Sequence, residues 1–98
     1  MDASGVLRDI NRDVSNNPVT IFGRVRTLMN ELGANFRERD IDVDPEGYLM
    51  QLVLTELTGQ PTVPYVFVNG QFIGGADDTL ALAASGELLR LLREANAL

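Results

Sequence analysis

The stretch that decides the fold reads TGQPTVPYVFVNGQFIGGADD and covers residues 58–78. Within it, Asn69-Gly70 separates two apolar runs, residues 64–68 and 71–73. Asn-Gly between such runs is the strongest short-range signal of a β-hairpin, because both residues tolerate the positive φ angles of its turn. The sequence therefore predicts two antiparallel strands, followed by a helix that begins after Gly74-Gly75.

The first third of the chain predicts helix, strand and helix in turn. Ser4 is a suitable N-cap for the first helix, and Asn17-Pro18 ends it, because the residue before proline avoids helical backbone angles. Residues 19–22 suit a short strand at the buried centre of a sheet. A second helix ends at Gly33. The apolar positions of the two helices are Val6, Leu7, Ile10, Val14, Val25, Leu28, Met29 and Leu32.

The middle of the chain predicts an edge strand and a third helix. Residues 36–43 read as a strand whose charged centre, residues 37–40, suits the edge of a sheet. Asp44 is a suitable cap for the helix, with Pro45 in its first turn. The predicted core face of this helix consists of Leu49, Leu52, Val53 and Leu57. After the hairpin, Ser85-Gly86 separates two short helices, so the alternation predicts one α/β domain over residues 1–98.

The composition excludes several classes of function. The chain has no Cys and no His, which removes thiol nucleophiles, disulfides and the usual ligands of zinc and iron–sulfur sites. The acidic residues have no spacing that suggests a calcium or magnesium site. The net charge of −6 disfavours nucleic acid as a partner. With no membrane-spanning stretch and no signal-like N-terminus, we expect a soluble, cytoplasmic monomer that holds no metal.

Two features after residue 60 suggest a binding surface. A proline bond such as Val63-Pro64 is cis in only about one case in twenty, so the bond by itself favours an ordinary trans strand start. The segment Gly74-Gly75-Ala76-Asp77-Asp78 opens a helix, whose unpaired N–H groups attract a carboxylate, and Asp77 or Asp78 could hold an ammonium group beside it. A glycine turn with an aspartate cap explains the same residues without a ligand, and caps outnumber ligand sites.

Taken together, these segments resemble a dithiol-type glutaredoxin over nearly the whole chain. The most specific parts are Thr58-Gly59-Gln60, Thr62-Val63-Pro64, Phe67-Val68-Asn69-Gly70, and Ile73-Gly74-Gly75 with Asp77-Asp78-Thr79. The resemblance implies a thioredoxin-like fold, in which helices flank a four-stranded mixed sheet. It also implies that Val63-Pro64 is cis, which turns the Val63 backbone outward toward an extended peptide.

The resemblance further implies a glutathione site. Gln51 resembles the glutamine that meets the glycine carboxylate, and Thr62, Val63 and Pro64 resemble the loop that pairs with the cysteine backbone. The turn that grips the γ-glutamyl end corresponds to Gly75, Ala76, Asp77 and Asp78. Glutathione, as ligand or co-substrate, and glutathionylated proteins are then the expected partners.

The chain departs from the family pattern between Phe22 and Gly23. At that point glutaredoxins carry a loop with Ser and Lys and then the Cys-Pro-Tyr-Cys active site, so this chain has no catalytic residue to carry over. The residues alone also mark this junction as unusual. Only Gly23-Arg24 lie between the predicted strand and the next apolar helical position, which leaves little room for a turn.

Three interpretations follow for the function. If the missing segment belongs to the protein, the chain represents a glutathione-dependent thiol–disulfide oxidoreductase, and we prefer this interpretation because the other family features are intact. If Phe22 and Gly23 are truly joined, the protein is a non-catalytic deletion variant that binds glutathione or a protein partner. A structural protein that works through its acidic surface ranks last, because no residue pattern picks out such a surface.

Overall fold

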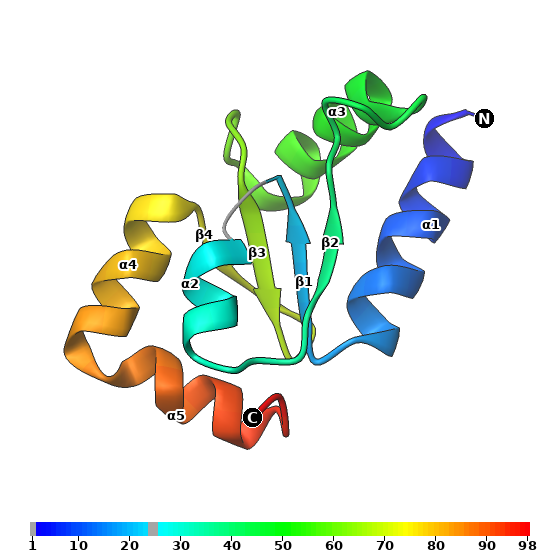
Figure 1. The fold of residues 1–98 in the computed structure, drawn as a ribbon. Helices are drawn as coiled ribbons and strands as arrows, with labels where there is room; N and C mark the ends of the chain where they lie inside the picture. Colours follow the sequence, from blue (N-terminus) through cyan, green and yellow to red (C-terminus); the bar gives the residue numbers. More distant parts are fainter. Residues whose placement is uncertain (1, 24–25) are drawn as a thin grey trace.

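The computed structural model describes residues 2–23 and 26–98 (Figure 1). Arg24 and Val25, and with them the start of the second predicted helix, lie outside these residues. The elements are α1 (Ala3–Asn16), β1 (Val19–Phe22), α2 (Arg26–Glu31), β2 (Arg37–Arg39), α3 (Gly47–Thr58), β3 (Tyr65–Val68), β4 (Gln71–Gly74), α4 (Ala76–Ser85) and α5 (Glu87–Glu94). Among these residues, every helix falls short of the length and hydrophobicity that a membrane span needs.

The sheet is mixed and has the strand order β2-β1-β3-β4. β1 pairs in parallel with β2 and antiparallel with β3, and β3 pairs antiparallel with β4. Every residue of β1 and β3 is buried, as central strands require. These pairings confirm the predicted thioredoxin-like α/β fold, with residues 19–22 at the centre and the charged strand at an edge.

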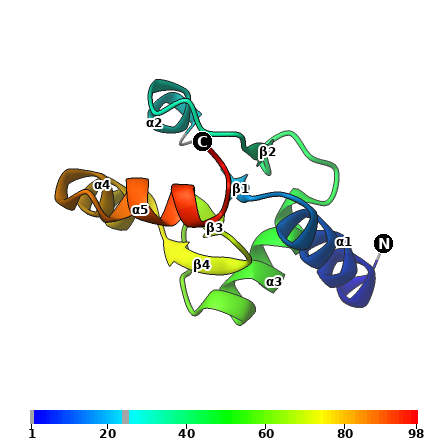
Figure 2. The same cartoon turned by 90° about the horizontal axis from the view of Figure 1, so that it is seen from below.

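Helices cover both faces of the sheet, as Figure 2 shows from below. On one face α1 and α3 pack over Phe22, Tyr65 and Phe67. On the other face α2 and α5 pack over Ile21 and Val66. The alternation of these side chains along β1 and β3 follows from the pleat of a strand, which sends successive residues to opposite faces.

The hairpin forms as predicted. Asn69 and Gly70 have φ angles of 52° and 78°, which are the left-handed values that a two-residue hairpin turn requires. On β3, the Phe67 ring meets Phe22 of β1 edge to face, with 5.9 Å between ring centroids. The Val63-Pro64 peptide bond before β3 is cis.

Two predicted helix caps and one strand length were wrong. Asp2, not Ser4, caps α1, where its Oδ1 accepts a hydrogen bond from the N–H of Gly5 at 2.8 Å. Asp44 does not cap α3, which begins at Gly47, because the Asp44 carboxylate instead accepts from the N–H of Glu46 and binds Arg39. The predicted strand 36–43 is extended only over Arg37–Arg39, since the chain turns at residues 41–43.

The predicted core face of α3 was also partly wrong. Met50 and Leu54 are buried, whereas Leu52 and Leu57 are 51% and 50% exposed. Gly47 explains why the buried face of α3 differs from the predicted one, because a Cβ atom on Gly47 would lie 1.8 Å from the carbonyl oxygen of Ile41. The loop passes so close to the start of the helix that the face carrying residues 47, 50 and 54 must turn inward.

Candidate functional site

A cavity of about 330 Å³ lies between the loop before β3 and the start of α4. We call it the groove. One wall consists of Thr62, Val63 and Pro64, and the other is formed by the first turn of α4 and the residue before it. The lining residues are Gln60, Thr62, Val63, Pro64, Gly75, Ala76, Asp77 and Asp78. The structure thus brings together all the predicted glutathione contacts except Gln51, and it adds Gln60.

The loop wall offers the backbone of Val63 to the groove. The Val63 side chain is 41% exposed, and neither its N–H nor its C=O has a hydrogen-bond partner within the described residues. The carbonyls on either side are occupied, because Gln60 Nε2 donates to the oxygens of Thr62 at 2.8 Å and Pro64 at 2.9 Å. An extended peptide could therefore pair with one residue of this loop, as in β-strand addition.

The helix wall is built by the cap of α4. The N-cap is Gly75, and its N–H lies 3.4 Å from Asp78 Oδ2. The buried Thr79 hydroxyl donates to the Gly75 carbonyl at 2.7 Å, which anchors the first turn. Exposed carboxylates of Asp77 and Asp78 beside a helix N-terminus give this wall both N–H donors and acceptors for an ammonium group.

Gln51 does not line the groove. Its Nε2 donates to the carbonyl of Pro61 at 3.2 Å, so the side chain reaches from α3 to the loop one residue before Thr62. In this position it supports the loop from outside. Gln60 was not among the predicted contacts, although it stands in the same Thr58-Gly59-Gln60 segment that carried the resemblance.

The residue after Phe22 lies directly against the groove's loop. Gly23 has a φ angle of 123°, and its N–H donates to the carbonyl of Arg39 at 2.9 Å. A Cβ atom on Gly23 would lie 2.9 Å from the Cα of Pro64. The junction at which the family pattern breaks is therefore adjacent to the cis-proline bond, at the end of the sheet where the groove opens.

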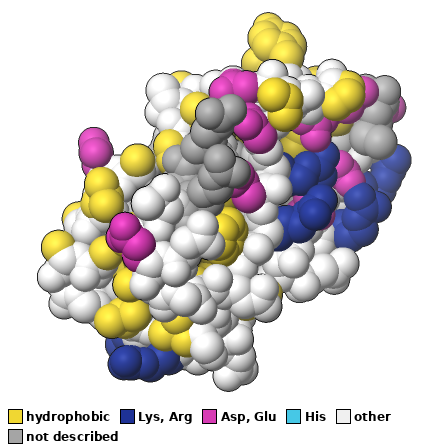
Figure 3. All heavy atoms as spheres, in the orientation of Figure 1, with side chains coloured by type: hydrophobic (Ala, Val, Ile, Leu, Met, Phe, Trp, Pro, Cys, Tyr) yellow, Lys and Arg dark blue, Asp and Glu magenta, His cyan; other side chains and the backbone are white. Residues whose placement is uncertain are grey.

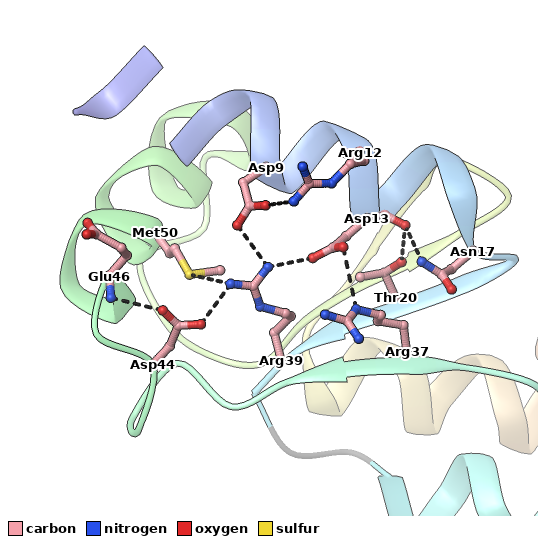
Figure 4. A network of polar contacts seen from close by, with 10 residues as sticks. All are labelled: Asp9, Arg12, Asp13, Asn17, Thr20, Arg37, Arg39, Asp44, Glu46 and Met50. Atoms are coloured by element: carbon pink, nitrogen blue, oxygen red, sulfur yellow. Dashed lines mark hydrogen bonds and ion pairs between the residues drawn. The ribbon is translucent and has the colours of Figure 1, made fainter. Parts of the chain in front are cut away.

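A second polar cluster lies beside β2, an edge strand of the sheet (Figure 4). There Arg39 donates to Asp9 at 2.9 Å, to Asp13 at 2.8 Å and to Asp44 at 2.7 Å. The hydrogen bond from Arg39, and after it the one from the Glu46 N–H, lowers the pKa of the Asp44 carboxyl. On the surface, basic and acidic side chains gather together over α1 and β2 (Figure 3).

This second cluster ties α1, β2 and the loop before α3 together. The Arg39 side chain is only 15% exposed, and Asp13 on α1 is buried. Residues 37–40 were predicted as the charged centre of an edge strand, and β2 does lie at the edge of the sheet, but that prediction did not include the ion pairs of Arg39. In the described part of the chain, no three Asp, Glu, His or Cys side chains are placed to hold a metal ion.

The comparisons with known proteins agree on one family. The glutaredoxin family model matches residues 23–73. Glutaredoxin-C6 of Oryza sativa subsp. japonica is 44% identical over 93 residues, which cover 87% of this chain and 83% of the rice protein. The aligned length exceeds the covered part of this chain, so some positions of the rice protein have no counterpart here. The family match also begins at Gly23, directly after the junction.

Solved structures give the same result. The chain superposes on the crystal structure of wheat glutaredoxin with a TM-score of 0.91 and 39% identity, over 98% of this chain and all of that one. It superposes on the buckwheat glutaredoxin–glutathione complex with a TM-score of 0.93 and 30% identity, over 98% and 94% of the two chains. On the strength of its sequence relatives and its fold, this chain belongs to the glutaredoxin family.

Proposed function

We propose that this chain binds glutathione in the groove and that it contributes no thiol of its own to any reaction there. The observation that carries the proposal is the groove itself, which joins the backbone of Val63, unpaired among the residues that the structure describes, to the N-terminus of α4. The buckwheat relative, whose fold superposes closely on this one, forms a complex with glutathione. We extend that ligand to the present chain because its groove residues offer matching chemistry.

Two parts of glutathione have complementary groups in the groove, and the third has a candidate beside it. The Val63 N–H and C=O would pair with the backbone of the cysteine residue, in the manner of an added β-strand. The N-terminal turn of α4 would receive the γ-glutamyl carboxylate, and Asp77 or Asp78 would accept from its ammonium group. Gln51, which points at the loop rather than into the groove, is our candidate for the glycine end.

Thiol–disulfide exchange needs a thiolate that attacks a disulfide sulfur and a thiol that leaves. The 98 residues include no cysteine, so this chain supplies neither. A second candidate function, glutathione-dependent oxidoreductase, is favoured by the family match that begins at Gly23 and by the intact groove after it. That activity requires a cysteine-bearing segment between Phe22 and Gly23.

The binding proposal is tested by titrating ¹⁵N-labelled protein with S-methylglutathione, which cannot form a disulfide. We expect the amide signals of Val63 and Asp78 to shift in a saturable way, while that of Asp42, on a loop that does not line the groove, stays in place. N-acetyl-S-methylglutathione, which lacks the ammonium group, should bind more weakly. Unmoved signals at Val63 and Asp78 at millimolar ligand would contradict the proposal.

Intact mass separates the two candidate functions. A mass of 10.7 kDa with no labelling by a thiol reagent supports a binding module without catalysis. A larger mass together with a reactive thiol supports the oxidoreductase. An assay of glutathione mixed-disulfide reduction should agree with the mass, since only the longer chain can turn over.

A further inference from the structure

Side-chain amides, rather than backbone groups, satisfy the carbonyls of the loop before β3. Gln60 Nε2 donates to the Thr62 oxygen at 2.8 Å and to the Pro64 oxygen at 2.9 Å. An amide nitrogen carries two hydrogens, so both donors of Gln60 are engaged. The two carbonyls flank Val63, whose own backbone groups have no partner within the described residues.

The main chain of Gln60 is fixed to the core. Its N–H donates to Thr58 Oγ1 at 3.1 Å, and its carbonyl accepts from the Tyr65 hydroxyl at 2.9 Å. The Tyr65 side chain is fully buried, and its hydroxyl lies 3.2 Å from Thr55 Oγ1 on α3. The Gln60 side chain therefore extends toward the groove from a rigid base.

Gln60 also touches the opposite wall. A Cβ atom added to Gly75 would lie 3.0 Å from Gln60 Nε2 and 3.3 Å from Oε1. Gly75 is the N-cap of α4, so the amide plane of Gln60 lies against the helix start. One side chain thus contacts both walls of the groove.

We propose that Gln60 is the positioning residue of the groove. By holding the carbonyls of Thr62 and Pro64, it leaves the N–H and C=O of Val63 as the backbone pair that a ligand meets. Its contact with Gly75 fixes the spacing between this pair and the start of α4. The inference rests on the proposed binding of glutathione, and it assigns to Gln60 a role that acts through Val63 rather than on the ligand.

The test compares three variants for S-methylglutathione affinity by calorimetry and for thermal stability. Gln60→Met keeps the length of the side chain but removes both donors, and we expect its affinity to fall about tenfold or more. Gln71→Met makes the same exchange at an exposed residue of β4 outside the groove and should bind like the wild type. Ile10→Val destabilises the core beneath α1 and should lower the melting temperature without changing affinity.

A second measurement gives the affinity of Gln60→Met if that variant has low stability. The rise of its melting temperature with ligand concentration reports affinity through linkage, even when part of the protein is unfolded. Binding by Gln60→Met within twofold of the wild type, or an equal affinity loss in Ile10→Val, would overturn the inference. If the wild type itself does not bind S-methylglutathione, the proposed function is wrong. Equal binding by the wild type and Gln60→Met would instead leave the proposed function standing and overturn only the role of Gln60.

Discussion

Arg39 shows how one residue can serve as the link among three segments. Its guanidinium group donates to Asp9 and Asp13 on α1 and to Asp44 in the loop before α3. Burial disfavours the charge of Arg39, but the hydrogen bonds to these carboxylates outweigh that cost and raise its pKa above the ordinary value. Loss of the guanidinium group would leave three neighbouring carboxylates without their common counter-charge.

We therefore predict that Arg39→Met lowers the free energy of unfolding by about 3 kcal/mol, as expected when one partner of a buried ion pair is removed. Urea unfolding measures this. The matched control is Arg12→Met, since Arg12 also binds Asp9 but its side chain is 66% exposed. An exposed pair contributes about 0–1 kcal/mol, so the control should stay near the wild type. Equal losses of unfolding free energy in both variants would show that the ion pairs of Arg39 contribute no more to stability than an exposed ion pair does.

The lowered pKa of Asp44 predicts an acid-dependent loss of stability. Its causes are the hydrogen bond from Arg39 and then that from the Glu46 N–H. A carboxyl whose pKa is lower in the folded state stabilises the fold above the unfolded value of about 3.9. That contribution disappears as the pH falls through the folded-state pKa. Asp44→Asn should therefore lose less stability than the wild type when urea unfolding is followed from about pH 6 to about pH 2. Parallel curves for the two proteins would contradict this assignment.

At the scale of elements, the turn between β4 and α4 leaves little room for a side chain at Gly74. Gly74 has a φ angle of 123°, and a Cβ atom there would lie 2.4 Å from Asp78 Oδ2. Both the backbone angle and the contact make any larger residue at this position strained. The same carboxylate caps Gly75 and lines the groove, so a change at residue 74 reaches the ligand site through Asp78.

We predict that Gly74→Ala lowers the free energy of unfolding by about 3 kcal/mol through backbone strain and the displaced cap. It should also abolish binding of S-methylglutathione. Gly33→Ala is the control, because Gly33 has a φ angle of 74° but an added Cβ meets nothing within 4 Å. Its cost should be about 1–2 kcal/mol, with unchanged affinity. Urea unfolding and calorimetry give both values, and a Gly74→Ala protein that binds normally would contradict the role of the cap.

At the scale of the whole molecule, charge opposes the proposed ligand. The formal net charge is −6, and Asp77 and Asp78 lie in the groove. Glutathione carries one more carboxylate than ammonium at neutral pH, so long-range repulsion accompanies its local contacts. At 0.1 M salt, repulsion between exposed charges that lie more than about 10 Å apart is largely screened.

The affinity for S-methylglutathione should consequently rise by about two- to threefold between roughly 10 mM and 150 mM salt. Asp77→Asn should reduce this salt dependence. Asp42→Asn removes the same charge from an exposed loop away from the groove and should leave it nearly unchanged. Calorimetric titrations at several salt concentrations make the comparison, and an affinity that falls with salt would contradict the repulsion.

Much of the fold could be predicted because its signals are local. Asn69-Gly70 forms a hairpin turn through its own backbone preferences, and Pro18, Gly33 and Gly59 end helices for the same reason. The groove residues on both walls could also be named, because each wall is a short continuous segment. The missing family segment was predicted between Phe22 and Gly23, and the family match begins at Gly23.

The remaining features depend on contacts between distant segments. The pair Met50 and Leu54 and the pair Leu52 and Leu57 both lie on α3, and local spacing did not identify the first pair as the buried one. The approach of Ile41 to Gly47 decides which face turns inward. Likewise, Arg39 lies 26 residues from Asp13 in the sequence, so nothing local marks it as a partner.

By itself, the sequence determined the order of the elements, the hairpin, the family and the lack of any thiol, because these follow from residue type and short-range spacing. The tertiary structure alone decided that Gln60 contacts both walls of the groove, that Gln51 supports the loop from outside and that Arg39 joins three segments. A long polar side chain can reach several partners, and only the packing of the surrounding elements selects among them.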